Sequence, residues 1–289
     1  KTIIRISNEL GNQMFMYASA YGISKTLNRT LLIDDESAFK SRKNISKYGL
    51  HNFELSSKNA SNKDKFLGIS GYLKRKLFKK IDKISFNKRF FTEIKNKKKI
   101  TKYNYEIFKK NFSDSLFLEG YFETQKYFID YENDIRKEFQ FKDKSKYLNS
   151  FYYNQIKNEN SVAICLRQNR FSEGKGNVNN KNNDLKSQSF SLEQINYINK
   201  SIKYFKNKLN SPVFYLWSND FKDLNDSFFD DKIIKVIHDV SFTSNLDKRA
   251  LDLFLLSQSK NHIVIPSSFN WWGAWLSNNS KKIILRPSD

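Results

Sequence analysis

Short apolar runs alternate with amphipathic helical runs along much of this chain, and this alternation constrains the fold more than any other feature. In the C-terminal half the clearest helical runs lie at residues 191–209 and 247–260, and the polar gaps at 168–190 and 239–246 read as loops. Strand, helix and strand in series predict a parallel sheet with right-handed crossovers. The apolar strand candidates of this half are residues 161–167, 212–218, 233–238, 262–267 and 282–287.

The N-terminal half repeats the pattern. Its expected elements are a strand at 2–6, a helix from about 12 to 28, strands at 30–34 and 115–122, and a helix around 124–139. The polar residues after this last helix mark a domain boundary near residue 155. We therefore predict an α/β chain of two domains, residues 1–155 and residues 156–289.

Composition narrows the class of protein. Of the 289 residues 39% are hydrophobic, so the chain can build a core and global disorder is not expected. One cysteine, Cys165, excludes an internal disulfide framework and is typical of a reducing compartment. With only three histidines besides, a structural zinc site is not expected. We expect neither a membrane span nor a signal peptide, because the apolar runs are too short for either.

The formal net charge is +21, which favours an anionic partner such as nucleic acid, a membrane surface or a charged substrate. A second explanation is the compositional bias of an AT-rich genome, because Lys and Asn are abundant even in loop-like stretches such as 177–184. The basic segment 67–111 has apolar residues at helical spacing. Such a helix can lie on an anionic leaflet. We favour a helix that packs on the core and turns a basic face to water.

Polar side chains follow several predicted strands, and ligands bind beyond the carboxyl ends of strands in open α/β sheets. Gly11 follows the first strand and permits a tight turn before a helix. Arg167 ends the strand at 161–167. Ser267 and Ser268 follow another strand at the start of a helix, where hydroxyls and free N–H groups attract phosphate. Because these strands belong to one parallel sheet, we expect the arginine and both serines at the same edge.

Two of these positions have a structural alternative. Ser267 could be an ordinary helix N-cap. Asp220, which follows Ser218 and Asn219 at the end of the strand at 212–218, could likewise cap a helix of its own. The convergence of Arg167 with the two serines is what favours a ligand site.

Four blocks of sequence carry a family resemblance. They are GNQMFMYA at 11–18, GYFETQKYF at 120–128, LDLFLLS at 251–257 and IPSSFNWWGAWL at 265–276. In this order, over nearly the whole chain, they resemble the bacterial α1,2-fucosyltransferases of glycosyltransferase family 11. The last block is the most specific, because two adjacent tryptophans after Ser-Ser-Phe-Asn are rare by chance.

The resemblance implies a GT-B type fold, in which two Rossmann-like domains face a cleft. It implies a metal-independent enzyme that moves L-fucose from GDP-fucose to a galactose-like hydroxyl with inversion at the anomeric carbon. The sequence agrees on the metal independently, because it contains no Asp-x-Asp motif. Residues 1–155 would bind the acceptor, and residues 156–289 would bind the GDP-sugar.

The resemblance also assigns roles to single residues. Arg167 would grip the donor diphosphate and support the departing GDP. Ser267 and Ser268 match hydroxyls that hold the same diphosphate. Asp252 matches a carboxylate that accepts from the guanine N–H groups; read alone it could be a solvated helix residue, but its neighbours are apolar and an unpaired carboxylate there is costly. Asn12 resembles a residue that reaches the donor from the other domain. The further donor-binding residues expected are Gly11, Gln13, Arg170, Asn219 and Phe269.

The stretch CLRQNRF (165–171) departs from the family's His-x-Arg-Arg-x-Asp pattern at three positions. Cys165 replaces the histidine, Gln168 the second arginine and Arg170 the aspartate. Arginine cannot serve as a general base at neutral pH, but the charge of Arg170 could restore the weakened clamp. We therefore place the catalytic base at Glu173. The alternatives are that Glu173 is a solvated loop acid and that a dissociative reaction needs little base.

The expected partners follow. They are a GDP-sugar donor and a glycan acceptor of the O-antigen type, carried on a lipid diphosphate. The basic surface would add peripheral contact with an anionic membrane at its cytoplasmic face. No metal, other cofactor or nucleic acid is expected, since nucleic-acid binding would explain the charge but none of the four blocks. Two alternatives stay open: a transferase of another GDP-deoxyhexose, and a homologue that has lost catalysis.

Overall fold

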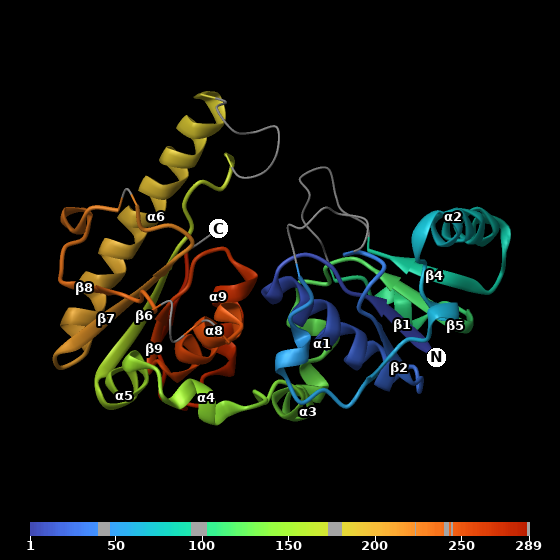
Figure 1. Ribbon diagram of the computed structural model, residues 1–289, viewed down its shortest axis with the longest axis horizontal. Coiled ribbons are helices and arrows are strands. Elements are labelled where there is room, and N and C mark those ends of the chain that lie inside the picture. Colours follow the sequence, from blue (N-terminus) through green and yellow to red (C-terminus); the bar gives the residue numbers. More distant parts are fainter. Residues whose placement is uncertain are drawn as a thin grey trace. The chain divides into compact units, whose positions relative to one another are not determined.

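The computed structural model describes residues 1–39, 47–93, 103–172, 181–222, 224–239, 243 and 245–287. They form two compact units, Lys1–Lys142 and Asp143–Asp289 (Figure 1). The division lies earlier than residue 155 because two short helices, α4 (Lys144–Leu148) and α5 (Phe151–Asn158), pack on α8 (Lys248–Gln258) of the second unit. No helix in these described ranges is long and apolar enough to cross a membrane.

The first unit is built on a five-stranded sheet in the order β3-β2-β1-β5-β4, and every neighbouring pair is parallel. The apolar β1 lies at its centre, as its buried Ile3 and Ile4 require. The strands are β1 (Thr2–Arg5), β2 (Leu31–Asp34), β3 (Lys58–Asn59), β4 (Lys88–Thr92) and β5 (Phe112–Glu119), and the helices are α1 (Leu10–Thr26), α2 (Gly68–Ile84) and α3 (Glu132–Glu138).

Helix α1 is the central helix of this unit, and 14 of its 17 residues are buried. Apolar and small residues occur on all its sides, which is typical of a helix enclosed by protein. At Gly22 an added Cβ would lie 2.0 Å from the backbone oxygen of Tyr127. Glycine therefore permits the close approach of α1 to the short 3₁₀ turn η4 (Gln125–Tyr127).

The second unit has a five-stranded sheet in the order β10-β9-β6-β7-β8, again parallel throughout. Its longest helix, α6, contributes Ile195, Ile198, Ile202 and Phe205 to the core that covers β6 and β7. The remaining elements are β6 (Asn160–Leu166), α6 (Lys181–Lys208), β7 (Pro212–Ser218), β8 (Ile233–Lys235), β9 (Asn261–Ile263), α9 (Ser268–Leu276) and β10 (Ile284–Leu285).

Besides β3, α4 and α5, which were not expected, three stretches differ from the sequence-based expectation. Helix α6 begins at Lys181, ten residues before the predicted start at 191, because its polar first turns extend a helix whose apolar side begins later. The basic segment 67–111 contains a strand, β4, as well as the helix α2. The stretch around 124–139 forms two 3₁₀ turns before the short helix α3.

Candidate functional site

The candidate site of the second unit lies at the carboxyl edge of its sheet. Strand β6 pairs with β7 on one side and with β9 on the other. The chain continues from β6 to β7 and β8, then returns to form β9 and β10 on the opposite side, so the order of the strands reverses between β6 and β9. Ligands of open α/β sheets bind at such a reversal point. Arg167 leaves β6 there, and Ser267 follows β9 at the same edge.

Two amide side chains hold the main chain where β6 ends. Gln194 of α6 accepts from the N–H of Arg167 at 3.0 Å and donates to its carbonyl at 2.9 Å. Asn219, after β7, accepts from the N–H of Gln168 at 2.8 Å and donates to its carbonyl at 3.1 Å. Two successive residues are thus fixed from both sides, which sets the direction in which the Arg167 side chain leaves the strand. Sequence reasoning missed Gln194.

The rest of CLRQNRF is also tied down. The Gln168 side chain donates to the carbonyl of Asp220 at 2.7 Å, and Asn169 donates to the Asp220 carboxylate at 3.2 Å. Asp220 thus anchors this loop, and among the described residues no α-helix begins at it. The Arg170 guanidinium lies over the ring of Phe190, 5.6 Å from its centre, on an exposed surface. A role for Arg170 in the diphosphate clamp stays a prediction.

The turn between β9 and α9 is shaped by Asn270, which is fully buried. Its side-chain oxygen accepts from the N–H of Ile265 at 2.8 Å and so closes the loop that carries both serines. Ser267 occupies the N-cap position, yet within the described chain its side chain caps none of the helix N–H groups. The ordinary N-cap explanation for Ser267 therefore does not hold. Phe269 lies half-buried in the first turn of α9.

The tryptophan block that follows serves the packing of α9. The ring centroids of Trp272 and Trp275 lie 5.1 Å apart at a steep angle, and both rings are buried. Gly273 faces α8, where an added Cβ would lie 2.1 Å from Cδ2 of Leu256. The close contact of these helices fixes where α9 begins, and therefore where Ser267 and Ser268 lie.

Asp252 of α8 has a partner that sequence reasoning missed. Its Oδ1 lies 2.7 Å from Nε2 of His238, a residue that follows β8 and whose side chain is almost fully buried. Cys165, at the end of β6, lies close to both Asp252 and Asn270, and burial raises the pKa of its thiol to about 12. Cys165, Asp252 and Asn270 therefore bring β6, α8 and α9 together behind the edge that carries Arg167.

The first unit places the Gly-Asn-Gln residues differently from the expectation. The left-handed residue of the turn is Asn8, with φ 64°, whereas Gly11 already lies in the first turn of α1. Gln13 is fully buried, donates to the carbonyls of Asn8 and Lys47, and accepts from a backbone N–H, so its amide is used inside the unit. Asn12 is accessible and donates to the carboxylate of Glu123 at 2.6 Å.

A cavity of about 260 Å³ lies at the carboxyl edge of the first sheet. The strand order β3-β2-β1-β5-β4 reverses between β1 and β5, which is where this cavity opens. It combines cationic, anionic and neutral polar groups around a small volume, which suits a polyhydroxylated ligand better than a bare anion. Its polar lining includes Arg5, Asn8, Thr92, Glu93, Glu119 and Tyr121.

Two buried carboxylates shape this cavity. Glu93 accepts from the N–H groups of Tyr121 and Phe122 at 2.8 and 2.9 Å, which fixes the chain after β5. Burial alone would raise the pKa of Glu119, but its hydrogen bonds to Arg75 and Lys79 outweigh that effect and hold the pKa below its usual range. Glu119 therefore stays charged at the cavity wall.

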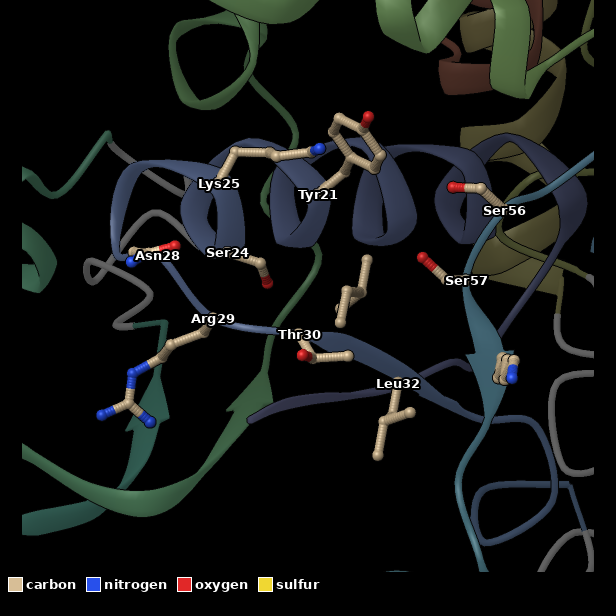
Figure 2. A pocket seen from close by; sticks show the side chains of 11 residues that line it. Tyr21, Ser24, Lys25, Asn28, Arg29, Thr30, Leu32, Ser56 and Ser57 are labelled. Atoms are coloured by element: carbon tan, nitrogen blue, oxygen red, sulfur yellow. The ribbon is translucent and has the colours of Figure 1, made fainter.

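A larger cavity, of about 530 Å³, lies at the opposite edge of the same sheet. Figure 2 shows its wall, where Ser24 of α1 and Thr30, Ser56 and Ser57 from the segments before β2 and β3 surround the space. It opens at the amino ends of the strands, away from the edge at which ligands of such sheets bind. We therefore regard the smaller cavity as the candidate site of this unit.

Two further expectations concern the catalytic base and a bound metal. Glu173, the expected catalytic base, lies outside the described residues. Within the described ranges no three His, Cys, Asp or Glu side chains gather in a manner that could hold a metal ion.

Comparison with known proteins gives a match over almost the whole chain. The model of glycosyl transferase family 11 matches residues 2–288. An alpha-1,2-colitosyltransferase of Escherichia coli is 28% identical over 295 residues, covering 99% of this chain and 91% of that protein. The O-antigen biosynthesis glycosyltransferase WbnK of Escherichia coli is 24% identical over 307 residues, covering 98% of this chain and 92% of that protein.

Among solved structures, NodZ alpha-1,6-fucosyltransferase soaked with GDP-fucose is similar to this chain with a TM-score of 0.54. The two are 13% identical, and the match covers 96% of this chain and 92% of NodZ, a protein from Bradyrhizobium. At this identity the likeness concerns the fold, which is of the GT-B type.

Proposed function

Because the chain belongs to glycosyltransferase family 11, we propose that it transfers L-fucose, or a closely related deoxyhexose, from a GDP-sugar to a hydroxyl of a glycan acceptor. The observation that carries this proposal is the convergence of Arg167 and the start of α9 at the reversal point of one parallel sheet. A guanidinium fork and a helix N-terminus together offer the donors that a diphosphate accepts.

The proposed reaction is a single displacement. The acceptor oxygen forms a bond to the anomeric carbon of the sugar while the bond to the diphosphate oxygen breaks, so the configuration inverts. Negative charge grows on the departing GDP, and we propose that Arg167 stabilises it. Gln194 holds the main chain of Arg167, and the arginine itself supplies the positive charge, so we propose that transfer proceeds without a metal.

The proton of the acceptor hydroxyl needs a receiver. We retain Glu173 for this role as a proposal that stems from the sequence alone. Glu173→Gln should then lower turnover while leaving GDP affinity unchanged. A dissociative reaction, in which the bond to GDP breaks early, predicts little change in turnover.

We propose that Asp252 determines which nucleobase of the donor the enzyme accepts. A carboxylate accepts from the N–H groups on the Watson–Crick edge of guanine, whereas adenine and uracil offer a different pattern there. The hydrogen bond with His238 orients this carboxylate. The pair would make the enzyme select GDP over ADP and UDP.

For the acceptor we propose the cavity at the carboxyl edge of the first sheet. Its mixture of carboxylates, Arg5, Asn8 and Tyr121 suits the hydroxyls of a galactose-like residue. The similarity to an O-antigen transferase and to an alpha-1,2-transferase supports an O-antigen repeat as acceptor and an α1,2 linkage. Such a repeat would be carried on a lipid diphosphate.

The relative named a colitosyltransferase gives a specific reason to consider a second donor. Colitose is fucose without its 3-hydroxyl. A site that hydrogen-bonds a hydroxyl rejects the analogue lacking it by about 10⁴-fold or more, whereas a site shaped for the deoxy sugar rejects the added hydroxyl by only about 10²-fold. Initial rates with both GDP-sugars therefore distinguish the two enzymes.

The proposed function is tested by calorimetric titration of the protein with GDP, ADP and UDP in the presence of EDTA, followed by transfer assays with GDP-fucose and GDP-colitose. Micromolar binding of GDP alone, with turnover of one GDP-sugar, is expected. Binding without turnover of either donor on any galactose-terminated acceptor would favour a homologue that has lost catalysis. Absence of binding to all three nucleotides would overturn the proposed donor site.

A further inference from the structure

Helix α2 presents its apolar side chains to solvent. Ile69, Leu73, Leu77, Ile81 and Ile84 recur at helical spacing on one face, with exposed fractions between 38% and 90%. Phe86, just after the helix, is also exposed. This arrangement is the reverse of a helix that buries its apolar face. The core-packed interpretation favoured from the sequence is therefore wrong for this face.

The opposite face of α2 is held by polar contacts. Arg75 makes a bidentate pair with Glu119 at the end of β5, both distances being 2.6 Å, and Lys79 bonds the same carboxylate. Asp82 is buried and accepts from the N–H of Phe90 in β4 at 2.7 Å. A helix fastened by charges on its inner side cannot roll to bury its apolar side, so the outward stripe is a fixed feature of the unit.

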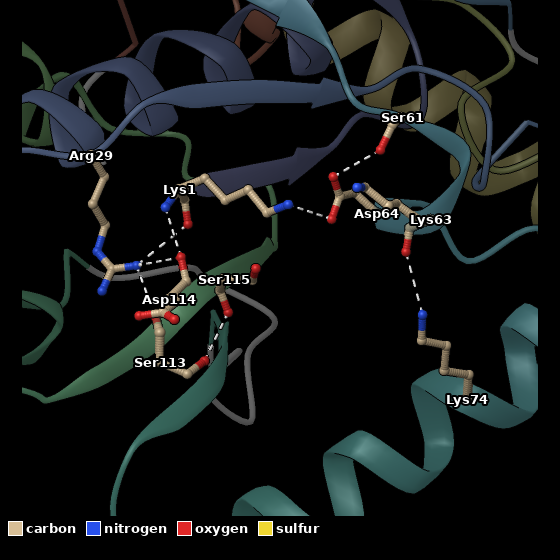
Figure 3. Close-up of polar contacts among 9 residues, drawn as sticks. All are labelled: Lys1, Arg29, Ser61, Lys63, Asp64, Lys74, Ser113, Asp114 and Ser115. Atoms are coloured by element: carbon tan, nitrogen blue, oxygen red, sulfur yellow. Dashed lines mark hydrogen bonds and ion pairs between the residues drawn. The ribbon is translucent and has the colours of Figure 1, made fainter.

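A further tie holds the flank of the helix. Figure 3 shows Lys74 of α2 donating to the carbonyl of Lys63, at 3.3 Å. The turn that carries Lys63 is fixed in its own right, because Asp64 bonds both Lys1 and Ser61 at 2.6 and 3.0 Å (Figure 3). The position of α2 is thus set at its flank as well as at its inner face.

The charges around the apolar stripe have one sign. Lys76, Lys80 and Lys83 are exposed along its margin. The single acidic residue of the helix, Asp82, is buried on the inner side. An apolar stripe with a cationic margin is complementary to a surface that is apolar inside and anionic outside.

We propose that α2 docks on an anionic lipid surface, with the stripe of Ile69, Leu73, Leu77, Ile81 and Ile84 among the lipid headgroups and the lysines against the headgroup anions. A helix of 17 residues is about 25 Å long and lies in the plane of the surface. The proposal extends the proposed function, since an acceptor carried on a lipid would be met at such a surface.

Two other partners could be considered for this face of α2, a second copy of the chain and a nucleic acid, and the charges argue against both. A second copy that used the same face in a symmetric pair would bring lysines against lysines. A nucleic acid would engage the lysines but leave the isoleucines and leucines in water. A lipid surface satisfies both the stripe and its margin.

The proposal is tested by co-sedimentation of the full chain with vesicles of phosphatidylcholine alone or mixed with phosphatidylglycerol. Binding to the mixed vesicles is expected, weakening as salt is added. Leu73→Ser/Leu77→Ser should lower the partition coefficient by about tenfold or more, because two leucine side chains lose their apolar burial. Lys80→Glu/Lys83→Glu should also lower the partition coefficient, and the decrease should be larger at low salt than at high salt.

The matched controls lie on α6. Leu185 and Leu192 are exposed at 63% and 55%, close to the 58% and 55% of Leu73 and Leu77, so Leu185→Ser/Leu192→Ser removes the same apolar surface elsewhere. Lys200→Glu/Lys203→Glu changes the net charge as much as the α2 lysine variant. Both control variants should bind vesicles like the parent chain. Circular dichroism and GDP affinity, unchanged in every variant, show that the fold is intact.

Equal loss in the α6 controls would mean that binding follows overall charge and apolarity, and would overturn the proposal. The proposal would also be overturned if the parent chain did not bind anionic vesicles. The same holds if the α2 leucine variant bound vesicles normally and changed only in its dimerisation, measured by sedimentation, or in its binding to duplex DNA. The vesicle assay contains neither donor nor acceptor, so its failure is distinguishable from failure of the proposed transfer reaction.

Discussion

Nε2 of His238 lies 2.7 Å from Oδ1 of Asp252, joining the segment after β8 to helix α8. His238→Ala should weaken GDP binding by about tenfold or more, because a hydrogen bond to a charged group contributes about 1.5–3 kcal/mol. The preference for GDP over ADP should also shrink. Calorimetric titration of both nucleotides measures these changes, and His238→Gln, which retains a donor, should recover part of the affinity. His51→Ala is the control, and a His238→Ala protein with the parent's GDP affinity would refute the assignment.

Replacing Arg167 should lower turnover more than replacing Arg170. Arg167→Ala is expected to lower turnover by about 100-fold or more, the usual effect of removing one donor to developing negative charge. Arg167→Lys keeps the positive charge but loses the forked pair of donors, so its turnover should lie between that of the parent chain and that of Arg167→Ala. Arg170→Ala should have a smaller effect, because its guanidinium lies over Phe190. Steady-state rates and GDP titration decide the order; normal turnover in Arg167→Ala would remove the donor-site assignment.

Gly273 should not tolerate a side chain. Its added Cβ would lie 2.1 Å from Leu256, so Gly273→Ala should lower stability by about 1–3 kcal/mol through overpacking. Thermal melting of the single variant and of Gly273→Ala/Leu256→Ala measures the coupling, and the double variant should lose less than the sum of the two. Gly22→Ala offers the contrast. Its obstacle is the backbone oxygen of Tyr127, which no trimming of a side chain removes, and it should cost more.

His262 predicts a loss of stability in acid. Burial in β9 is the main reason that its pKa falls to about 3, and the nearby Lys282 adds to the effect. In the unfolded chain the pKa is about 6.5, so below that pH the unfolded state binds the extra proton and stability falls until about pH 3. His262→Leu should flatten the dependence of Tm on pH between these values. His51→Leu, at an exposed position, should leave the slope of the parent chain.

The sequence predicted the parts of this molecule that depend on local pattern. The parallel strands, the convergence of Arg167 with Ser267 and the two-unit organisation follow from periodicity and from the edge at which strands end. Gln194 and His238 were missed because their importance rests on contacts with Arg167 and Asp252, 27 and 14 residues away, which no local pattern encodes.

Two errors have a physical cause. The tight turn was assigned to Gly11 because glycine is the usual left-handed residue, but Asn8 also tolerates that conformation and adopts it. Strand β4 was hidden because its sequence, KRFFT, lies in a run of lysines and apolar residues that also fits a helix. The spacing of α2 predicted its helix correctly, but periodicity does not say which face turns inward.

The contact of Arg75 and Lys79 with Glu119 has a consequence for which residues of α2 can be substituted during evolution. The inward residues of α2 hold the helix on the sheet, and the outward residues are the ones that we propose for contact with a lipid surface. Substitutions of Leu73 or Leu77 can therefore adjust adhesion without affecting folding. Glu119 also lines the cavity that we propose for the acceptor, so one carboxylate both holds α2 on the sheet and shapes the wall of that cavity.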